Sequence, residues 1–354
     1  MKKILHIVDR LSIGGVTTFI KNLAIHQLSE NKISILTIEN SKFDDKGPVD
    51  EILNSEVELL RLSLHKYNPY SIIKLQKYIR ANDIIHVHQF PSLYWVGLAS
   101  IFQNTKKFIF TEHIYESNRR KKALIPFERF IYNRFDRVIG VSQSVAIDLN
   151  NWINLPKKIT FINNGININT EHIDINEEIK SQFLGKKLVI MAARIGEPKN
   201  QKTLIQAFAL LDNTYHLLLA GDGPLVNEMK DLIQKLNLTN KVTFLGRRND
   251  VLSLMKTCDL SVLSSYSEGL PLGLLESLSV GTPCIGSDIK TIRPVLNNKD
   301  MLFTVDDEKE LADKIRISIE DKDMNFKLVQ YGKTLIKNYS IETMVNKYLE
   351  TYER

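Results

Sequence analysis

Residues 258–281 read CDLSVLSSYSEGLPLGLLESLSVG, and this stretch predicts a β-strand, a loop and an α-helix in direct succession. The run from Cys258 to Leu263 is short and apolar, as buried strands are. Pro271 suits the first turn of a helix that continues through several leucines to a stop at Gly281. The stretch therefore predicts one strand-to-helix unit of a parallel sheet with crossover helices.

Two carboxylates, Glu268 and Glu276, stand on either side of this junction. Free backbone N–H groups at a helix start favour a phosphate. Since a carboxylate repels a phosphate, both glutamates fit better as acceptors of hydrogen bonds from hydroxyls that flank it. A sugar nucleotide has hydroxyls on both sides of its diphosphate. The alternative is an ordinary loop, in which Glu268 favours the helix dipole and Glu276 is solvated.

The same alternation of β-branched runs and helical stretches fills both halves of the chain. The predicted strands are Lys3–Val8, 32–38, 84–88, 107–111, 137–141 and 159–162, then 187–193, 216–221, 241–245, 260–263 and 283–287. A length of 354 residues favours two domains. We therefore predict an α/β fold of two Rossmann-like, doubly wound parallel-sheet domains that face each other across a ligand-binding cleft.

The predicted domain boundaries follow from where this alternation pauses. Residues 1–168 form the N-terminal, acceptor-binding domain, and the polar, weakly periodic residues 169–186 form a linker. Residues 187–338 form the C-terminal domain that binds the nucleotide, and residues 339–354 form a helix that could pack back on the N-terminal domain.

Composition and charge narrow the class of protein. A hydrophobic content of 43% and a charged content of 25% are typical of a globular protein. No apolar run approaches the length of a membrane span, and no cleavable export signal opens the sequence, so we expect a cytoplasmic protein. Cys258 and Cys284 lie in apolar runs, which favours buried free thiols.

A basic surface is predicted in the first half of the chain. Residues 1–170 hold 23 basic and 15 acidic side chains, which gives this half a net charge of +8. Because the whole chain carries +6, the remaining residues carry −2. The densest cluster is Arg119-Arg120-Lys121-Lys122, followed by aromatic residues. This pattern fits binding to an anionic membrane surface, so the protein could associate peripherally with the inner face of the cytoplasmic membrane. The alternative is a solvated basic face that binds no partner. No nucleic-acid motif accompanies it.

Loops after two strands of the first half carry candidate contact residues. Gly14-Gly15 precedes a helix and lets the backbone approach a ligand closely, although a tight turn explains the pair equally well. His113 follows a predicted strand directly, so we favour it for substrate contact. His86 and His88 share one face of a strand, and mostly structural roles are expected because further zinc ligands do not accompany them.

A cationic pair opens the second half. Arg194 ends a predicted strand and Lys199 begins a helix, so both can converge on one anion. A diphosphate fits this arrangement, whereas a solvent-facing pair is the alternative.

With these residues assembled, the chain resembles the family 4 (group 1) glycosyltransferases of the GT-B fold. The motifs follow the family's order over about residues 4–288: Gly14-Gly15, Val141-Ser142, Asn164-Gly165, Arg194-x4-Lys199 with the helix after it, Ala220-Gly221-Asp222-Gly223-Pro224, and Glu268-x7-Glu276 running into Gly281-Thr282-Pro283. The sequence departs from the family at Val16-Thr17 and at Ser287-Asp288, which weakens any inference about contacts there.

The resemblance implies four residues of the reaction centre. Arg194 and Lys199 would bind the donor diphosphate, and Glu268 would contact hydroxyls of the donor sugar. His113 would lie near that sugar and the reacting atoms.

The resemblance also implies a set of donor-binding residues. Glu276 would hold the ribose, the nucleobase would lie near Gly246 and Arg247, and backbone groups would meet the phosphates. Those backbone groups belong to Leu270, Leu272 and Gly273 in one domain and to the Gly14-Gly15 pair in the other.

The activity that the resemblance implies is transfer of a sugar with retention of its anomeric configuration, from a nucleotide sugar, expected to be a UDP-sugar, to a glycan or lipid-linked glycan. Bacterial surface polysaccharide synthesis, as of capsule or lipopolysaccharide, is the expected setting. No cofactor and no metal are expected. The Asp321-Lys322-Asp323 triplet is similar to a metal motif of another glycosyltransferase fold, but its polar setting favours a solvated turn. The alternatives are a non-catalytic nucleotide-sugar-binding protein and an epimerase of the same fold.

Overall fold

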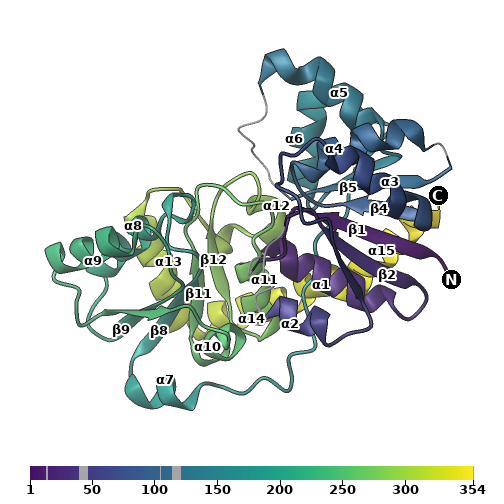
Figure 1. The fold of residues 1–354 in the computed structure, drawn as a ribbon. Coiled ribbons are helices and arrows are strands. Elements are labelled where there is room, and N and C mark those ends of the chain that lie inside the picture. Colours follow the sequence, from purple (N-terminus) through teal and green to yellow (C-terminus); the bar gives the residue numbers. More distant parts are fainter. Residues whose placement is uncertain (13–14, 40–46, 104, 114–120, 354) are drawn as a thin grey trace. The chain divides into compact units, whose positions relative to one another are not determined.

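The computed structural model describes residues 1–12, 15–39, 47–103, 105–113 and 121–353. The chain divides into two compact units, Met1–Gly165 with Ile341–Arg354, and Ile166–Ser340. Each unit is an α/β fold around its own parallel sheet (Figure 1), which confirms the predicted fold class.

The first unit contains a seven-stranded sheet in the order β3-β2-β1-β4-β5-β6-β7. Every neighbouring pair is parallel, as crossover helices require. The strands are β1 Lys3–Val8, β2 Lys32–Thr37, β3 Glu58–Arg61, β4 Ile84–Val87, β5 Lys107–Glu112, β6 Arg137–Gly140 and β7 Ile159–Phe161. The order reverses beside β1, which is the switch point where such sheets bind ligands.

Helices cover both faces of this sheet because its strands are apolar on both sides. Ile4 and Val8 of β1 pack with α1 Gly15–Gln27, α2 Pro48–Leu53 and α15 Ile341–Glu353. Leu5 and Ile7 point to the opposite face, toward α3 Ser71–Ala81, α4 Ser92–Ala99, α5 Ile125–Asn133 and α6 Gln143–Ile153. The last helix of the chain is thus part of the first unit.

The second unit contains a parallel six-stranded sheet in the order β10-β9-β8-β11-β12-β13. The strands are β8 Lys187–Ala192, β9 Tyr215–Ala220, β10 Val242–Gly246, β11 Leu260–Leu263, β12 Cys284–Ser287 and β13 Leu302–Phe303. The helices are α7 Glu177–Gln182, α8 Gln201–Ala209, α9 Val226–Lys235, α10 Val251–Thr257, α11 Leu272–Ser279, α12 Arg293–Leu296, α13 Glu308–Glu320 and α14 Lys322–Leu335.

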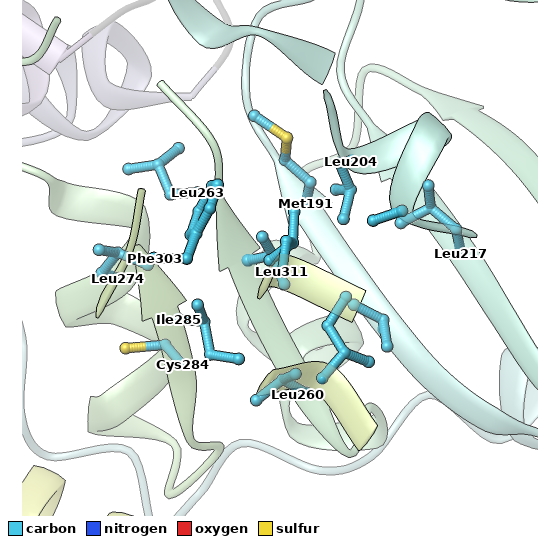
Figure 2. Close-up of a cluster of buried hydrophobic side chains, with 14 of the residues drawn as sticks. Met191, Leu204, Leu217, Leu260, Leu263, Leu274, Cys284, Ile285, Phe303 and Leu311 are labelled. Carbon is cyan, nitrogen blue, oxygen red and sulfur yellow. The ribbon is translucent and has the colours of Figure 1, made fainter. Parts of the chain in front are cut away.

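The larger core of the second unit lies on one face of its sheet. Figure 2 shows Met191, Leu217 and Ile285 of the sheet with Leu204 of α8 and Leu311 of α13. The smaller core on the other face joins the sheet to α7 and α10. Both cysteines are buried free thiols, as predicted.

The structure differs from the sequence prediction in a few places. Each predicted strand is present, with ends shifted by at most one residue. Two further strands, β3 and β13, were not predicted. The strand β3 carries charges at both ends, and β13 has only two residues. The predicted linker, residues 169–186, lies inside the second unit and includes the short helix α7, Glu177–Gln182. Asn176 anchors it, since its side chain donates to Asp250 and its N–H donates to Thr257.

Two helix starts also differ from the prediction. Pro271 precedes α11 as its N-cap residue, so the helix proper begins at Leu272. Asp321, predicted in a solvated turn, caps α14 by accepting hydrogen bonds from the N–H groups of Asp323 and Met324. A carboxylate at a helix start needs no metal to explain it.

Candidate active site

The carboxyl-end loops of four neighbouring strands gather the predicted residues of the second unit. In sheet order these strands are β10, which ends at Gly246, and then β9, β8 and β11, which are followed by Gly221, Arg194 and Glu268 in turn. Because the strands are parallel, their carboxyl ends share one edge of the sheet. Residues up to about 75 positions apart in sequence are thereby brought to one edge.

Lys199 and Glu268 meet directly at this edge. The Lys199 Nζ lies 2.5 Å from Glu268 Oε1, which also accepts a hydrogen bond from Ser265 Oγ at 2.5 Å. The Glu268 side chain is 8% exposed and that of Lys199 is 26% exposed. The sequence assigned these two residues to different parts of a donor, and the structure shows that their side chains also pair with each other.

The loops that carry Lys199 and Glu268 are held together by a second set of polar contacts. Asn200 adopts a left-handed conformation and caps α8, with its side chain accepting from Thr203 N–H. Asp306 accepts hydrogen bonds from both Asn200 and Tyr266. The Tyr266 N–H also donates to the Pro198 carbonyl, so the two loops form one fixed framework.

Arg194 stands at the end of β8 with an exposed side chain. Among the described residues, none forms an ion pair or a side-chain hydrogen bond with its guanidinium, whereas its carbonyl accepts from Gln201 Nε2 at 3.0 Å. The backbone on either side is fixed, since Ala193 N–H donates to Ala220 and Ile195 N–H donates to Asp222. The fold therefore fixes the backbone of Arg194 and leaves its charge available.

Two glycines make this backbone arrangement possible. A Cβ on Gly221, whose φ is +151°, would lie 2.0 Å from the Ala193 carbonyl oxygen, and a Cβ on Gly223 would lie 2.0 Å from that of Ile195. No side chain fits at either position without moving the backbone that carries Arg194. The Gly-Asp-Gly motif was recognised in the sequence, but this reason for it was not.

We expect Gly223→Ala to destabilise the second unit by about 1–3 kcal/mol, because overpacking against a fixed carbonyl has that cost. The melting temperature should fall by on the order of 5 °C in differential scanning calorimetry. Gly196→Ala is the matched control, because the nearest atom to its added Cβ lies 4.0 Å away. Equal melting temperatures for the two variants would contradict the close approach.

The start of α11 carries the remaining predicted phosphate and ribose contacts. The Leu272 N–H donates to the Leu270 carbonyl at 2.8 Å, so it is not free for a phosphate in this structure. Gly273 N–H has no such partner within the described ranges. Glu276 is half-buried, and burial raises the pKa of its carboxyl from 4.5 to about 7. A carboxylate in such a setting gains from hydroxyl donors.

The predicted nucleobase contacts lie at the end of β10. Gly246 has φ of +63°, and its carbonyl accepts from Gly221 N–H at 2.7 Å. Arg247 is 77% exposed and lies 3.8 Å from the Asp222 carboxylate. The Arg247 side chain is therefore held only weakly by the protein.

In the first unit, His113 lies at the end of β5 and lines a cavity of about 330 Å³. The cavity is lined by Asp9, Arg10, Val16, Glu39, Lys66, His88, Gln89, Phe90, Glu112 and His113. The pKa of His113 is lowered to about 3 by burial, so its ring is neutral, and its Nε2 has no hydrogen-bond partner among the residues that the structure describes. Gly15, exposed at the start of α1, adjoins Val16 in the wall of this cavity.

Asp9 is a cavity residue that sequence reasoning missed. It follows β1, accepts a hydrogen bond from Ser92 N–H at 3.0 Å and a short one from Ser92 Oγ, and is 7% exposed. Burial raises the pKa of its carboxyl to about 6. Its place after the central strand of a doubly wound sheet is the signal that could have indicated it.

His86 and His88 were given mostly structural roles, and the structure places both beside His6. Potential ligand nitrogens of the three rings lie within 4.8 Å of one another. Hydrogen bonds within the fold satisfy both nitrogens of His6 and of His86, and Nε2 of His88. His86 is thus structural, whereas His88 also lines the cavity.

The remaining predicted positions concern the glycine loop and the basic cluster. Gly14, Arg119 and Arg120 lie outside the described residues. Lys121 and Lys122 are exposed at the start of the segment that leads into α5.

Comparisons with known proteins give the family that this geometry resembles. The family model "Glycosyltransferase Family 4" matches residues 13–170, and the model "Glycosyl transferases group 1" matches residues 173–335. Between them the two models match nearly all of both units. The family resemblance predicted from the motifs is confirmed.

Individual relatives cover almost the whole chain. An Escherichia coli UDP-Gal:α-D-GlcNAc-diphosphoundecaprenol α-1,3-galactosyltransferase is 26% identical, over 89% of this chain and 90% of its own. A Campylobacter jejuni α-1,4-N-acetyl-D-galactosaminyltransferase, named for an undecaprenol-linked glycan, is 24% identical. The match covers 99% of this chain and 98% of the Campylobacter protein. The crystal structure of Anabaena HepE with UDP and glucose matches the full length of both chains with a TM-score of 0.87 at 20% identity.

Proposed function

The chain belongs to the group 1 glycosyltransferases of the GT-B fold, and on that premise we propose that it transfers a hexosyl group from a UDP-sugar to a hydroxyl of a lipid-linked glycan with retention of anomeric configuration. The observation that carries the proposal is the edge of the second sheet, where Arg194, whose side chain has no partner among the described residues, and the partly buried Lys199–Glu268 pair lie in neighbouring loops. The diphosphate of a nucleotide sugar requires cations, and its sugar hydroxyls require groups that accept hydrogen bonds.

Each residue at this edge has a proposed role. The Arg194 guanidinium and the Lys199 ammonium bind the diphosphate, and the Gly273 N–H at the helix start adds a neutral donor. Glu268 accepts a hydrogen bond from a hydroxyl of the transferred sugar, and Glu276 accepts from the ribose. Lys199 then shares its charge between Glu268 and the phosphate.

The proposed reaction is a same-face displacement. As the bond from the sugar to the diphosphate breaks, Arg194 and Lys199 stabilise the negative charge that develops on the leaving oxygen. That diphosphate oxygen accepts the proton of the acceptor hydroxyl while the new bond forms on the same face of the sugar. The two side-chain cations perform the charge stabilisation, so the proposal requires no metal and no cofactor.

The acceptor is proposed from the relatives. The Escherichia coli and Campylobacter jejuni enzymes are named for acceptors that are glycans on diphosphoundecaprenol. We propose an acceptor of this kind, used in bacterial surface polysaccharide synthesis, and the first to assay is N-acetylglucosamine linked through diphosphate to a shortened lipid.

A lipid-linked acceptor requires access to a membrane surface. No helix among the described residues combines the length and the apolar character needed to cross a membrane. On α5 and the turn before it, Leu124, Phe127 and Phe130 recur every three residues and are 40%, 41% and 48% exposed. With Lys121 and Lys122 beside them, these residues form an apolar and basic surface that suits anionic lipid at the inner face of the cytoplasmic membrane.

We expect the double variant Phe127→Ser/Phe130→Ser to lose most of its binding to vesicles that contain anionic phospholipid, in a sedimentation assay. Transfer to a water-soluble acceptor analogue should be unchanged, since neither ring contributes to the cavity or to the second unit. Ile317→Ser, which removes a 48% exposed apolar side chain from α13, is the control. Equal vesicle binding by the double variant and the wild type would contradict this surface.

Donor binding should depend on pH through Glu276. The carboxylate form accepts ribose hydroxyls better than the protonated form does, and the pKa of this carboxyl in the free protein is about 7. Below pH 7 the Kd for UDP-glucose should therefore rise as the carboxylate is protonated, by about tenfold in all, and above pH 8 it should be constant. A UDP-sugar is the proper probe, because its phosphates do not titrate in this range.

Glu276→Gln is the matched variant for that titration. Its affinity should be lower at pH 8 and nearly the same from pH 6 to 8. Because the folded pKa lies above the ordinary 4.5, ionisation opposes folding as pH rises through this interval, so the variant should also melt at a higher temperature at pH 8. An unchanged pH dependence in the variant would remove Glu276 from the donor site.

Thermal stabilisation by a panel of UDP- and GDP-sugars tests the proposed donor class, because a ligand of the native state raises its melting temperature. We expect UDP-sugars to stabilise the protein and GDP-sugars to do so much less. A non-catalytic binding protein would give the same shift without turnover, and an epimerase would convert the donor without an acceptor. No response to any UDP-sugar would contradict the proposed donor.

A further inference from the structure

A continuous set of buried hydrogen bonds runs from the C-terminal helix to the cavity of the first unit. Tyr352 OH lies 2.7 Å from His86 Nδ1 and accepts from Gln27 Nε2 at 3.3 Å. Gln27 Oε1 lies 3.0 Å from His6 Nε2, and His6 Nδ1 lies 2.9 Å from His88 Nε2. His6, His86 and Gln27 are 0% exposed, and His88 is 1% exposed.

This pattern assigns the protons on the rings. A neutral imidazole carries one N–H and one lone pair, and burial lowers the pKa of both His6 and His88, so both are neutral. Since Gln27 Oε1 can only accept, His6 Nε2 carries the proton and His6 Nδ1 accepts. His88 Nε2 therefore carries the second proton, and His88 Nδ1 has a free lone pair.

That lone pair has no partner within the described part of the chain. His88 Nδ1 is buried and makes no hydrogen bond, although the other five nitrogens of the three rings are satisfied. An unsatisfied buried acceptor costs free energy, and where it lines a cavity a donor group of a ligand can satisfy it. His88 lines the cavity that also contains Asp9 and His113.

We propose that His88 Nδ1 accepts a hydrogen bond from a hydroxyl of the acceptor sugar, and that Gln27, through His6, keeps this nitrogen unprotonated. The inference rests on the proposed function for the identity of the ligand. His88 is a binding residue that touches the substrate, whereas Gln27 and His6 are positioning residues.

The rest of the cavity fits a sugar ring. Its volume of about 330 Å³ lies at the small end of ligand pockets. Asp9, Glu39 and Glu112 add carboxylates, which accept hydrogen bonds from hydroxyls, and they outnumber the two cations of the lining, Arg10 and Lys66. Phe90 provides an aromatic surface for the apolar face of a sugar. The set favours a neutral, polyhydroxylated ring over the nucleotide part of the donor.

The sharpest variant is His88→Gln, because a glutamine amide can replace Nε2 as donor to His6 but leaves nothing at Nδ1. We expect its acceptor KM to rise about tenfold, with the donor KM and the UDP-sugar-induced thermal shift unchanged. The acceptor is N-acetylglucosamine linked through diphosphate to a shortened lipid. Tyr348→Phe is the control, since it removes a buried hydroxyl of the same network, bonded to Thr111, that does not line the cavity.

Imidazole nitrogen NMR of the ¹⁵N-histidine-labelled wild-type protein tests the proton assignment without any turnover. His88 should show a protonated Nε2 and an unprotonated Nδ1, and the Nδ1 resonance should shift when methyl N-acetyl-α-glucosaminide is added. This measurement stays decisive if His88→Gln does not fold, or if the wild-type protein shows no transfer and the proposed function fails.

A protonated His88 Nδ1 would overturn the inference, and so would an Nδ1 resonance that the sugar leaves unmoved. An acceptor KM that rises equally in His88→Gln and Tyr348→Phe would overturn it as well, because that result reports only a loosened core.

Discussion

Arg194→Ala should lower kcat/KM for transfer by about 10²–10³-fold while the melting temperature stays within about a degree of the wild type. The loss in rate is of the size found when one preorganised donor to a developing oxyanion is removed. The stability is unaffected because the guanidinium is exposed and has no partner among the described side chains, whereas its backbone is held through Gln201 and the neighbouring residues.

The control for this variant is Arg316→Ala, which removes an exposed arginine of α13 whose one ion pair within the described ranges is with Asp313. Its transfer rate should equal that of the wild type. Full transfer by Arg194→Ala would contradict the diphosphate site, and a large fall in its melting temperature would show instead that the side chain supports the fold.

Lys199→Met should lose transfer to a similar degree and should also be less stable by about 2–4 kcal/mol. Removing one partner of a buried ion pair leaves an uncompensated charge, here the Glu268 carboxylate with an 8% exposed side chain. The partial exposure of Lys199 in the wild type places the expected cost toward the lower part of the range for buried pairs. Calorimetry measures the loss of stability, and a transfer assay on the same preparation measures the loss of activity.

The double variant Lys199→Met/Glu268→Gln separates the two effects. It removes both charges, so its stability should return to within about 1 kcal/mol of the wild type, while transfer remains lost. Substantial transfer by the double variant would remove this pair from the reaction. A single Lys199→Met variant as stable as the wild type would contradict the buried pairing itself.

Most of the fold could be predicted from local sequence. Strands such as Lys3–Val8 and Leu260–Leu263 are compact β-branched or apolar runs bounded by polar residues, which is why their ends were placed closely. Glu58–Arg61 carries charges at both ends, and α7 depends on long-range contacts of Asn176 with Asp250 and Thr257. Local patterns carry no information about such contacts.

The site could be predicted only as separate motifs. Arg194, Lys199 and Glu268 were identified by residue type and by their place after predicted strands, but the pairing of Lys199 with Glu268 joins residues 69 positions apart. Spacing also cannot reveal that Gly223 is required by the Ile195 carbonyl. The free lone pair of His88 depends on hydrogen bonds across three elements, and neither composition nor periodicity encodes it.

The most direct test of the proposed activity is the anomeric configuration of the product. Purified protein, EDTA, an α-linked UDP-sugar from the panel and the shortened lipid-linked N-acetylglucosamine are incubated together, and the product is examined by NMR. We predict release of UDP together with a new α-glycosidic bond to the acceptor. A β-linked product, consumption of the donor without transfer, or no turnover with any UDP-sugar would contradict it.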